Sequence, residues 1–212
     1  MTLHPHWGHQ DLLEALARAR LEGSLPSALL LHGIRGVGKQ HFALWLARMI
    51  LCESPSQQGA CGTCHSCGLS GKIEHPDLHW YFPLPRPKNA STPEKLARAL
   101  EEARAEDLAS WRAAPLRPLG DVQAKSLYLA AAPTLRQKAH RRPSMGDSQV
   151  FIIAEAESLA PQESSSEAAN ALLKLLEEPP DGTVLILTSA EPGRLLPTIR
   201  SRTTQVHLPA LN

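Results

Sequence analysis

The feature that most constrains this chain is a glycine-rich segment, GIRGVGKQ, at residues 33–40. An apolar run precedes it, and a segment with apolar residues at helical spacing follows it. Between a strand and a helix, the Gly-x4-Gly-Lys pattern is typical of a phosphate-binding loop, because glycines let backbone N–H groups turn towards phosphate oxygens. We therefore predict that Gly33, Gly36, Gly38 and Lys39 bind the phosphates of a nucleotide, with Lys39 neutralising the β- and γ-phosphates. The alternative is a glycine-rich turn that arose by chance.

Two positions that normally hold Mg²⁺ in such sites are altered together. The metal is usually bound by a Ser or Thr hydroxyl directly after the lysine and by an acidic residue at the end of a neighbouring strand. Here Gln40 follows the lysine, and Ala154 ends the candidate strand VFIIA where the acidic residue is expected. Glu155 remains, and it either polarises water or is simply a charged strand end. We keep Gln40 and Glu155 as candidate nucleotide-site residues and predict no vigorous ATP hydrolysis, while binding of ATP or ADP stays open.

All four cysteines of the chain lie close together in the sequence, at Cys52, Cys61, Cys64 and Cys67. Two overlapping C-x2-C steps form tight turns that direct thiolates to one point, and Cys52 adds a fourth from the end of the preceding helix. We predict a closed, tetrahedral, structural Zn²⁺ site, because all-thiolate ligation leaves no open position for catalysis. Redox chemistry, free buried thiols and ligation by His65 are the alternatives.

The composition excludes several classes of protein. The chain has 212 residues, 42% hydrophobic and 20% charged, which fits a globular protein with a sizeable core. Its formal net charge of +1 argues against strong binding of nucleic acid by this chain alone. Its apolar runs are too short to span a membrane, and its N-terminus lacks the pattern of a signal peptide. We therefore expect a cytoplasmic protein, a setting in which clustered cysteines more often bind metal than form disulfides.

Strand and helix patterns alternate along the chain and indicate an α/β domain with a largely parallel sheet. The proline-rich segment 83–93 is expected to be an exposed linker. In the last predicted helix, an apolar stripe consists of Ala169, Leu172, Leu173 and Leu176. Strands are expected at 27–32, 77–82, 150–154, within 181–190 and from 204, and helices at 9–23, 39–52, 94–111, 121–142 (interrupted at Pro133) and 164–178.

Several segments together resemble bacterial DNA polymerase III clamp-loader subunits, and among these the delta-prime subunits. The segments are GIRGVGKQ, the spacing of the four cysteines, HPDLHWYF, AANALLKLLEEPP and LLPTIRSR, in the same order as in that family. NALLKLLEEPP together with SR after a P-T-I turn is highly specific, whereas the phosphate loop alone is not. The resemblance covers most of residues 1–208, apart from about 83–120, which we interpret as an insertion.

The resemblance implies a AAA+ nucleotide-binding-like domain over residues 1–208, with a five-stranded parallel sheet flanked by helices. It places an inserted zinc module at about 52–70, after the first helix of the nucleotide-binding core. The helical lid and the C-terminal collar domain of the family are expected to be absent from this chain. The chain alone is therefore not expected to assemble.

The resemblance also implies a role in a five-subunit arc that opens a ring-shaped sliding clamp and places it on primed DNA. In this family an SRC motif sends an arginine into the ATP site of a neighbouring subunit. Ser201-Arg202-Thr203 matches that motif, with Thr in place of Cys. Arg202 is the expected arginine finger, because a rigid cationic fork stabilises charge on the γ-phosphate; a surface ion pair is the alternative.

The implied partners are tau/gamma-like motor subunits, the delta subunit and, through the assembly, the sliding clamp and primed DNA. Delta-prime subunits are regarded as the stationary member of the arc, which lacks productive hydrolysis. Two other functions stay open. One is a motor ATPase that uses Lys39 and Glu155, and the other is a zinc-dependent nucleic-acid-binding module that uses the cysteines and the basic run 136–142.

Overall fold

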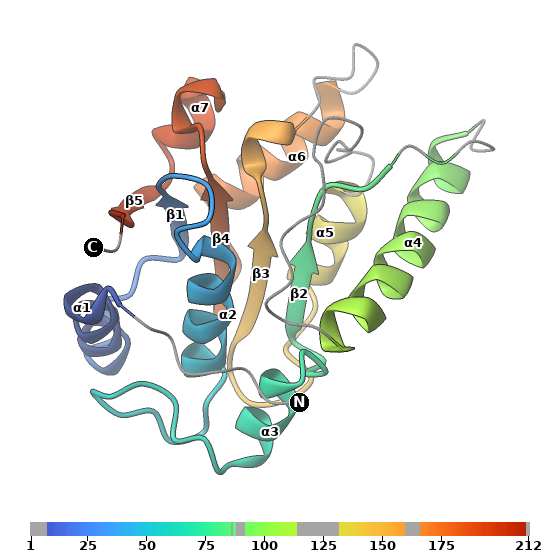
Figure 1. The fold of residues 1–212 in the computed structure, drawn as a ribbon. Helices are drawn as coiled ribbons and strands as arrows, with labels where there is room; N and C mark the ends of the chain where they lie inside the picture. The colour runs from blue at the N-terminus through green and yellow to red at the C-terminus, as the bar shows by residue number, and fades with distance from the viewer. Residues whose placement is uncertain (1–7, 86, 88–91, 114–131, 160–165, 211–212) are drawn as a thin grey trace.

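The computed structural model describes residues 8–85, 87, 92–113, 132–159 and 166–210 (Figure 1). A five-stranded sheet forms the centre of the molecule, and all its pairings are parallel. The strand order is β2-β3-β4-β1-β5, and segments that contain helices connect the successive parallel strands. The strands are β1 (Ala28–His32), β2 (Leu78–Tyr81), β3 (Gln149–Ile153), β4 (Thr183–Ser189) and β5 (Thr204–His207). The predicted α/β fold with a five-stranded parallel sheet is confirmed.

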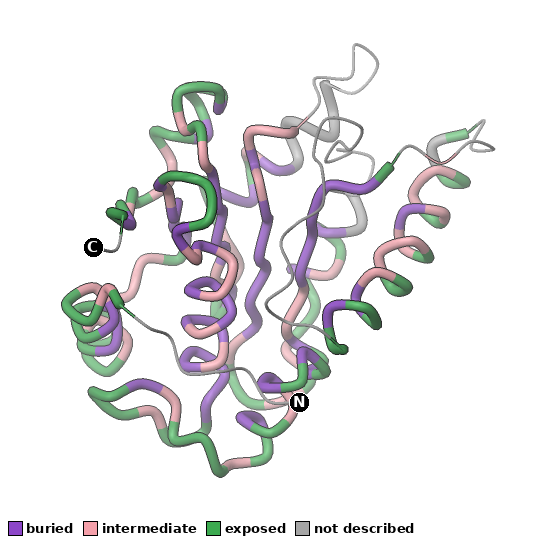
Figure 2. The backbone as a smooth tube through the Cα atoms, viewed as in Figure 1, coloured by how far each residue is buried: buried purple, intermediate pink, exposed green. Residues whose placement is uncertain are grey.

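Helices cover both faces of this sheet, because the central strands are apolar on both sides. Leu29 and Leu31 join the core cluster on one face, whereas Leu30 joins the cluster on the other. The first face carries α1 (Gln10–Leu21), α2 (Lys39–Ile50) and α4 (Pro93–Ala113). The second carries α5 (Ala132–Ala139), α6 (Ser166–Glu177) and α7 (Pro197–Arg200). Figure 2 shows the buried strands between helices whose outer sides are exposed.

The helix α4 lies within the range that the sequence suggested to be an insertion, and it packs on the core. Trp111 lies against Trp80 of β2, with 4.8 Å between the ring centroids. Arg104 donates a hydrogen bond to the carbonyl oxygen of Trp80 and lies over the ring of Tyr81. The prediction of an exposed linker over 83–93 is wrong at its start, because Leu84 is buried in the same cluster. Residues 86 and 88–91 lie outside the described part of the chain.

Two other details go beyond the sequence-based expectations, and a third expectation is tested only over part of its range. A short helix, α3 (His65–Gly71), lies in the cysteine-rich segment, where only turns were expected. In α6 the buried face also includes Leu175, and the side chain of Ala169 is outside the described part. Of the helix expected over 121–142, the structure describes α5; residues 121–131 are not described. In the described ranges, no helix is both long and apolar enough to cross a membrane.

Candidate functional site

The predicted phosphate loop lies between β1 and α2, at the carboxyl edge of the sheet (Figure 1). Gly36 and Gly38 have φ values of 83° and 92°, a left-handed conformation that other residues rarely adopt. At Gly33 the constraint is steric, since a Cβ atom there would lie 2.3 Å from the carbonyl oxygen of Leu208, just after β5. The three glycines are thus required by backbone geometry, as expected for a loop that turns N–H groups inward.

Lys39 begins α2, and its side chain is only 8% exposed. Its ammonium group donates hydrogen bonds to the carbonyl oxygens of Gly33 and Ile34, each at 2.8 Å. Burial lowers the pKa of Lys39, while the nearby carboxylates of Glu157 and Glu155 act in the opposite direction. The lysine therefore points into the loop, where a phosphate would replace the two carbonyl partners.

Gln40 makes a contact that its sequence position did not suggest. Its Nε2 donates a hydrogen bond to Oγ1 of Thr188 at 2.8 Å, across 148 positions of sequence. The backbone N–H of Glu155 donates to the same oxygen at 3.1 Å. Thr188 is fully buried at the end of β4, opposite Leu31 of β1. Sequence reasoning missed Thr188; its only signal was a polar residue near the end of a strongly apolar strand.

Glu155 is the second residue after β3 and has a left-handed conformation, with φ of 48°. Burial raises the pKa of its carboxyl group, and the adjacent charge of Glu157 raises it further. Glu157, a second residue missed in the sequence, accepts a hydrogen bond from the backbone N–H of Ala190 at 2.8 Å. Ala154, at the position where an acidic metal ligand was expected, is completely buried. The loop and both acidic residues thus meet at one edge of the sheet without the usual Mg²⁺ anchors.

The four cysteines converge as predicted. Their sulfur atoms all lie within 4.8 Å of one another, and the Cys52–Cys64 and Cys61–Cys67 pairs are each separated by 3.9 Å. A tetrahedral Zn²⁺ with Zn–S bonds of about 2.3 Å requires sulfur separations of roughly 3.8 Å. The arrangement therefore fits four-thiolate ligation of one zinc ion. His65 is exposed at the start of α3 and is not part of the cluster.

Backbone N–H groups around the cluster point at sulfur atoms, as they do in a preformed metal knuckle. Cys52 accepts from the N–H groups of Ser54 and Cys61, at 3.4 and 3.2 Å. Cys61 accepts from Cys64, and Cys64 from Cys67, at 3.4 and 3.3 Å. These donors favour the thiolate form that binds metal. Burial opposes it at Cys67, whose pKa is raised to about 12 in the absence of a metal charge.

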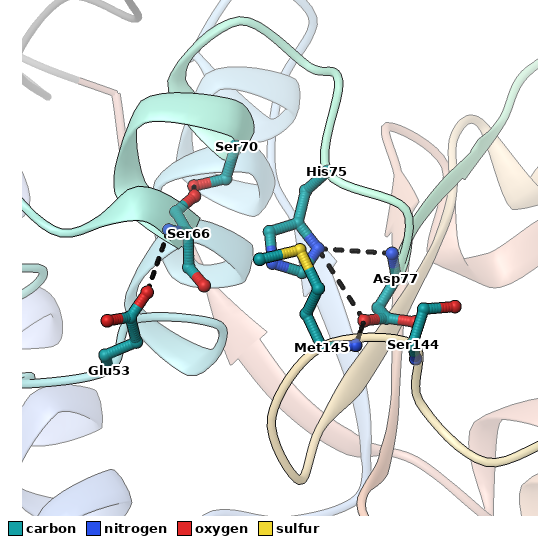
Figure 3. A network of polar contacts seen from close by, with 7 residues as sticks. All are labelled: Glu53, Ser66, Ser70, His75, Asp77, Ser144 and Met145. Carbon is teal, nitrogen blue, oxygen red and sulfur yellow. Dashed lines mark hydrogen bonds and ion pairs between the residues drawn. The ribbon is translucent and has the colours of Figure 1, made fainter.

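Polar contacts hold the cysteine-rich segment and the start of β2 in place (Figure 3). Glu53, next to the first cysteine, accepts a hydrogen bond from the N–H of Ser66 in α3 at 3.1 Å. The carboxylate of Asp77, which is 3% exposed, accepts from the N–H groups of Ser144 and Met145 at 2.6 and 2.7 Å. His75 accepts from the N–H of Asp77 at 3.1 Å. The HPD sequence therefore fixes the turn that leads into β3.

Arg202 lies between α7 and β5, at the surface. Its side chain is 31% exposed and pairs with Glu177 at the end of α6. It also donates to the carbonyl oxygen of Thr198 at 2.9 Å. Thr203, the next residue, donates through its hydroxyl to the carbonyl oxygen of Ile199 at 3.1 Å. Arg202 does not join the phosphate-loop site of its own chain through any of these contacts.

Comparisons with known proteins identify the family. The family model described as DNA polymerase III, delta subunit, matches residues 8–212. The chain is 35% identical over 182 residues to DNA polymerase III subunit delta' of Pseudomonas aeruginosa, and the match covers 86% of this chain and 43% of that protein. It is 29% identical to the Escherichia coli delta' subunit (92% of this chain, 46% of that protein) and 30% identical to the E. coli tau subunit (97% and 25%). The chain thus spans less than half the length of each relative.

A solved structure agrees on the fold. The crystal structure of a DNA polymerase III gamma subunit-related protein from Thermotoga maritima aligns with a TM-score of 0.50 and 19% identity, over 94% of this chain and 45% of that one. At this identity the likeness concerns the fold alone. The sequence comparisons carry the assignment: the chain belongs to the DNA polymerase III delta-subunit family, as a delta-prime-like member of the clamp-loader proteins.

Proposed function

We propose that this chain is the stationary, delta-prime subunit of a bacterial replicative clamp loader, which places the sliding clamp on primed DNA for DNA polymerase III. It does not turn over ATP productively, and it supplies Arg202 to the ATP site of a neighbouring tau- or gamma-like subunit. The observation that carries the proposal is the state of its own site. Gln40 points its amide at Thr188, and the methyl group of Ala154 is buried where a metal ligand is expected.

The chemistry of Arg202 supports a role in trans. A guanidinium group is always charged, and its fork of donors matches the oxygens of a transferring phosphoryl group. Glu177 holds the side chain in a defined position on the surface. The ATP of a neighbouring subunit would compete with this carboxylate for the guanidinium. The ion pair with Glu177 is thus the resting position of Arg202 in the isolated subunit.

Partner contacts beyond this domain belong to the proposal. The chain covers less than half the length of its delta' relatives, and we infer that delta and motor subunits join it in the assembly. We expect this chain to contribute the nucleotide-binding-like domain, with its four cysteines binding a structural Zn²⁺. The sliding clamp and primed DNA are then contacted by the assembled loader as a whole.

Reconstitution tests the role of Arg202. A form of the protein that includes the collar domain expected of the family is assembled with motor and delta subunits, and DNA-stimulated ATP hydrolysis is measured with the unaltered sequence and with Arg202→Ala. We expect a severalfold fall, since arginine fingers accelerate hydrolysis by about 10³-fold or more at the site they reach. Arg194→Ala, another exposed arginine paired with a glutamate, is the matched control and should leave the rate unchanged. An unchanged rate for Arg202→Ala in an intact assembly contradicts the proposal.

A motor ATPase is the second candidate, since Lys39 and Glu155 are retained and the tau subunits are also relatives. Mg²⁺-dependent hydrolysis by the purified chain, abolished by Lys39→Ala, would establish it in place of the stationary role. A zinc-dependent nucleic-acid-binding module is less well supported, given the net charge of +1. Tight binding of primed DNA by the chain alone, with a steep salt dependence, would favour it.

A further inference from the structure

We propose that the phosphate loop binds a nucleoside diphosphate without a divalent cation, and that Gln40 performs the positioning task that a loop hydroxyl and Mg²⁺ perform elsewhere. In a complete site the metal connects the loop to the phosphates and to the neighbouring strand end. Here the amide of Gln40 connects the loop helix directly to the strand end. The ligand is recognised by its phosphate groups, and ADP is the simplest probe of that class.

The link extends over three elements that surround the loop. Gln40 is the second residue of α2, and its Nε2 reaches Thr188 on β4. The hydroxyl oxygen of Thr188 also accepts the backbone N–H of Glu155, which follows β3. One buried oxygen therefore joins the loop helix to the carboxyl ends of β4 and β3, which are adjacent in the sheet. This arrangement fixes the start of α2, whose N–H groups are phosphate donors, without any ion.

The side chains present do not fit the usual Mg²⁺ site. A hydroxyl at position 40 would offer its oxygen to the metal, whereas Gln40 directs its amide donor towards Thr188. Its Oε1 is buried and has no hydrogen-bond partner among the described residues. Ala154 provides no oxygen in its side chain, and it is wholly buried. The carboxylates of Glu155 and Glu157 lie near Lys39, where they act as its counter-charges. The geometry thus favours a bound phosphate chain that meets cations of the protein instead of a metal.

Two cationic side chains of the loop, Lys39 and Arg35, are placed to bind phosphate groups. Lys39 already points its ammonium group at the loop interior through the carbonyl oxygens of Gly33 and Ile34. Arg35 lies close enough to lower the pKa of both Lys39 and Glu155. Arg35 is exposed, so its guanidinium is free to close over a phosphate without breaking a buried contact. Because the loop lysine also acts beside Mg²⁺ in a complete site, Arg35 is the cation that adds positive charge in place of the metal.

Binding of a fluorescent ADP derivative to the purified chain tests the proposal. Affinity is measured with Mg²⁺ and in buffer stripped of divalent ions with a chelating resin before the protein is added, because a soluble chelator would also remove zinc. We expect the two dissociation constants to agree within about twofold, and Lys39→Ala to weaken binding at least about tenfold in both buffers. Gln40→Thr should bind more weakly without Mg²⁺ than with it, while Gln137→Thr, an exposed control, should behave like the unaltered protein.

Each other outcome overturns the proposal. Binding that needs Mg²⁺ in the unaltered protein removes the claim of metal independence. If Gln40→Thr binds ADP with the same insensitivity to Mg²⁺ as the unaltered protein, Gln40 has no positioning role. If the unaltered protein binds ADP in neither buffer, a nucleoside diphosphate is excluded as the ligand. The inference rests on the incomplete nucleotide site of the proposed function, but its test uses no partner subunit. A failure here therefore leaves the arginine-finger experiment intact, and a failure of that experiment leaves this one intact.

Discussion

Arg112 donates hydrogen bonds from both Nε and Nη2 to the backbone carbonyl oxygen of Ile73, each at 3.1 Å. The contact joins the end of α4 to the residue at which the cysteine-rich segment returns to the sheet. Ile73 is only 5% exposed, and it has a φ of 58°, a left-handed conformation that is rare for a β-branched residue. The N–H groups of Ile73 and Glu74 donate hydrogen bonds to the carbonyl oxygens of Ser70 and Leu69. In helix endings with this hydrogen-bond pattern, glycine is the usual residue at the place that Ile73 takes here.

The backbone of Ile73 predicts an unusual order of stability for two substitutions. Both Ile73→Ala and Ile73→Gly remove a buried side chain, but only glycine is relaxed at positive φ. We expect Ile73→Gly to be more stable than Ile73→Ala by about 1 kcal/mol in urea unfolding. At Ile50, a buried residue with ordinary helical geometry at the end of α2, the order should be reversed. The same order at both positions would show that Ile73 is not under backbone strain.

The paired hydrogen bonds of Arg112 predict a second effect on stability. Arg112→Ala leaves the carbonyl oxygen of Ile73 without the only partners found for it among the described residues, and should lower the free energy of unfolding by about 1 kcal/mol. Arg98→Ala on the same helix removes only an exposed i,i+4 ion pair and should cost less than about 0.5 kcal/mol. Equal losses for the two variants would exclude a specific role for the Arg112 contact.

The four-cysteine cluster predicts which substitution removes zinc. Cys67 is fully buried and lies 3.9 Å from Cys61, so Cys67→Ala removes one corner of the tetrahedron. We expect elemental analysis to find one zinc ion per chain in the unaltered protein and none in this variant, which should also melt at a lower temperature. His65→Ala should retain one zinc ion per chain, because His65 is exposed and outside the cluster. Loss of zinc from the His65 variant would instead place that imidazole among the ligands.

Arg48 lies against the segment that carries the four cysteines, and its charge predicts an effect on the release of a bound metal ion. A methyl group at Gly62 would lie 3.7 Å from its Nη2, and one at Gly71 would lie 3.8 Å from its Cζ. Four thiolates and one Zn²⁺ have a net charge of about −2, which a neighbouring guanidinium stabilises. We expect Arg48→Met to release zinc to a chelator faster than the unaltered protein, with Arg48→Lys intermediate. Arg18→Met, at an exposed position of α1, is the control, and equal release rates for all four proteins would exclude the role.

Local motifs were sufficient to predict the glycine-rich loop, the cysteine cluster and the parallel sheet. In each case the constraint acts over a few residues: a glycine at positive φ, thiolates three positions apart, or an apolar strand before a helix. The Gln40–Thr188 hydrogen bond could not be predicted in this way, because it joins residues 148 positions apart and depends on the order of strands in the sheet. The conformation of Ile73 is equally hidden, since an isoleucine gives no sequence signal of a left-handed turn.

His79 on β2 predicts how stability depends on pH. Its ring stacks on Phe151, with 4.6 Å between the centroids, and burial lowers its pKa from 6.5 to about 4, with Lys138 and Arg104 contributing. Between these two pH values the unfolded chain binds a proton at this site that the folded chain does not, so stability falls as the pH decreases through this window.

His79→Phe keeps an aromatic ring and removes the titration. Between pH 7 and pH 5 it should lose about 1 kcal/mol less stability than the unaltered protein, an amount reduced because the ring is partly accessible to water. Urea unfolding at the two pH values measures this difference. The exposed His140→Phe should follow the unaltered protein, and a His79→Phe curve parallel to both would show that this imidazole does not titrate differently on folding.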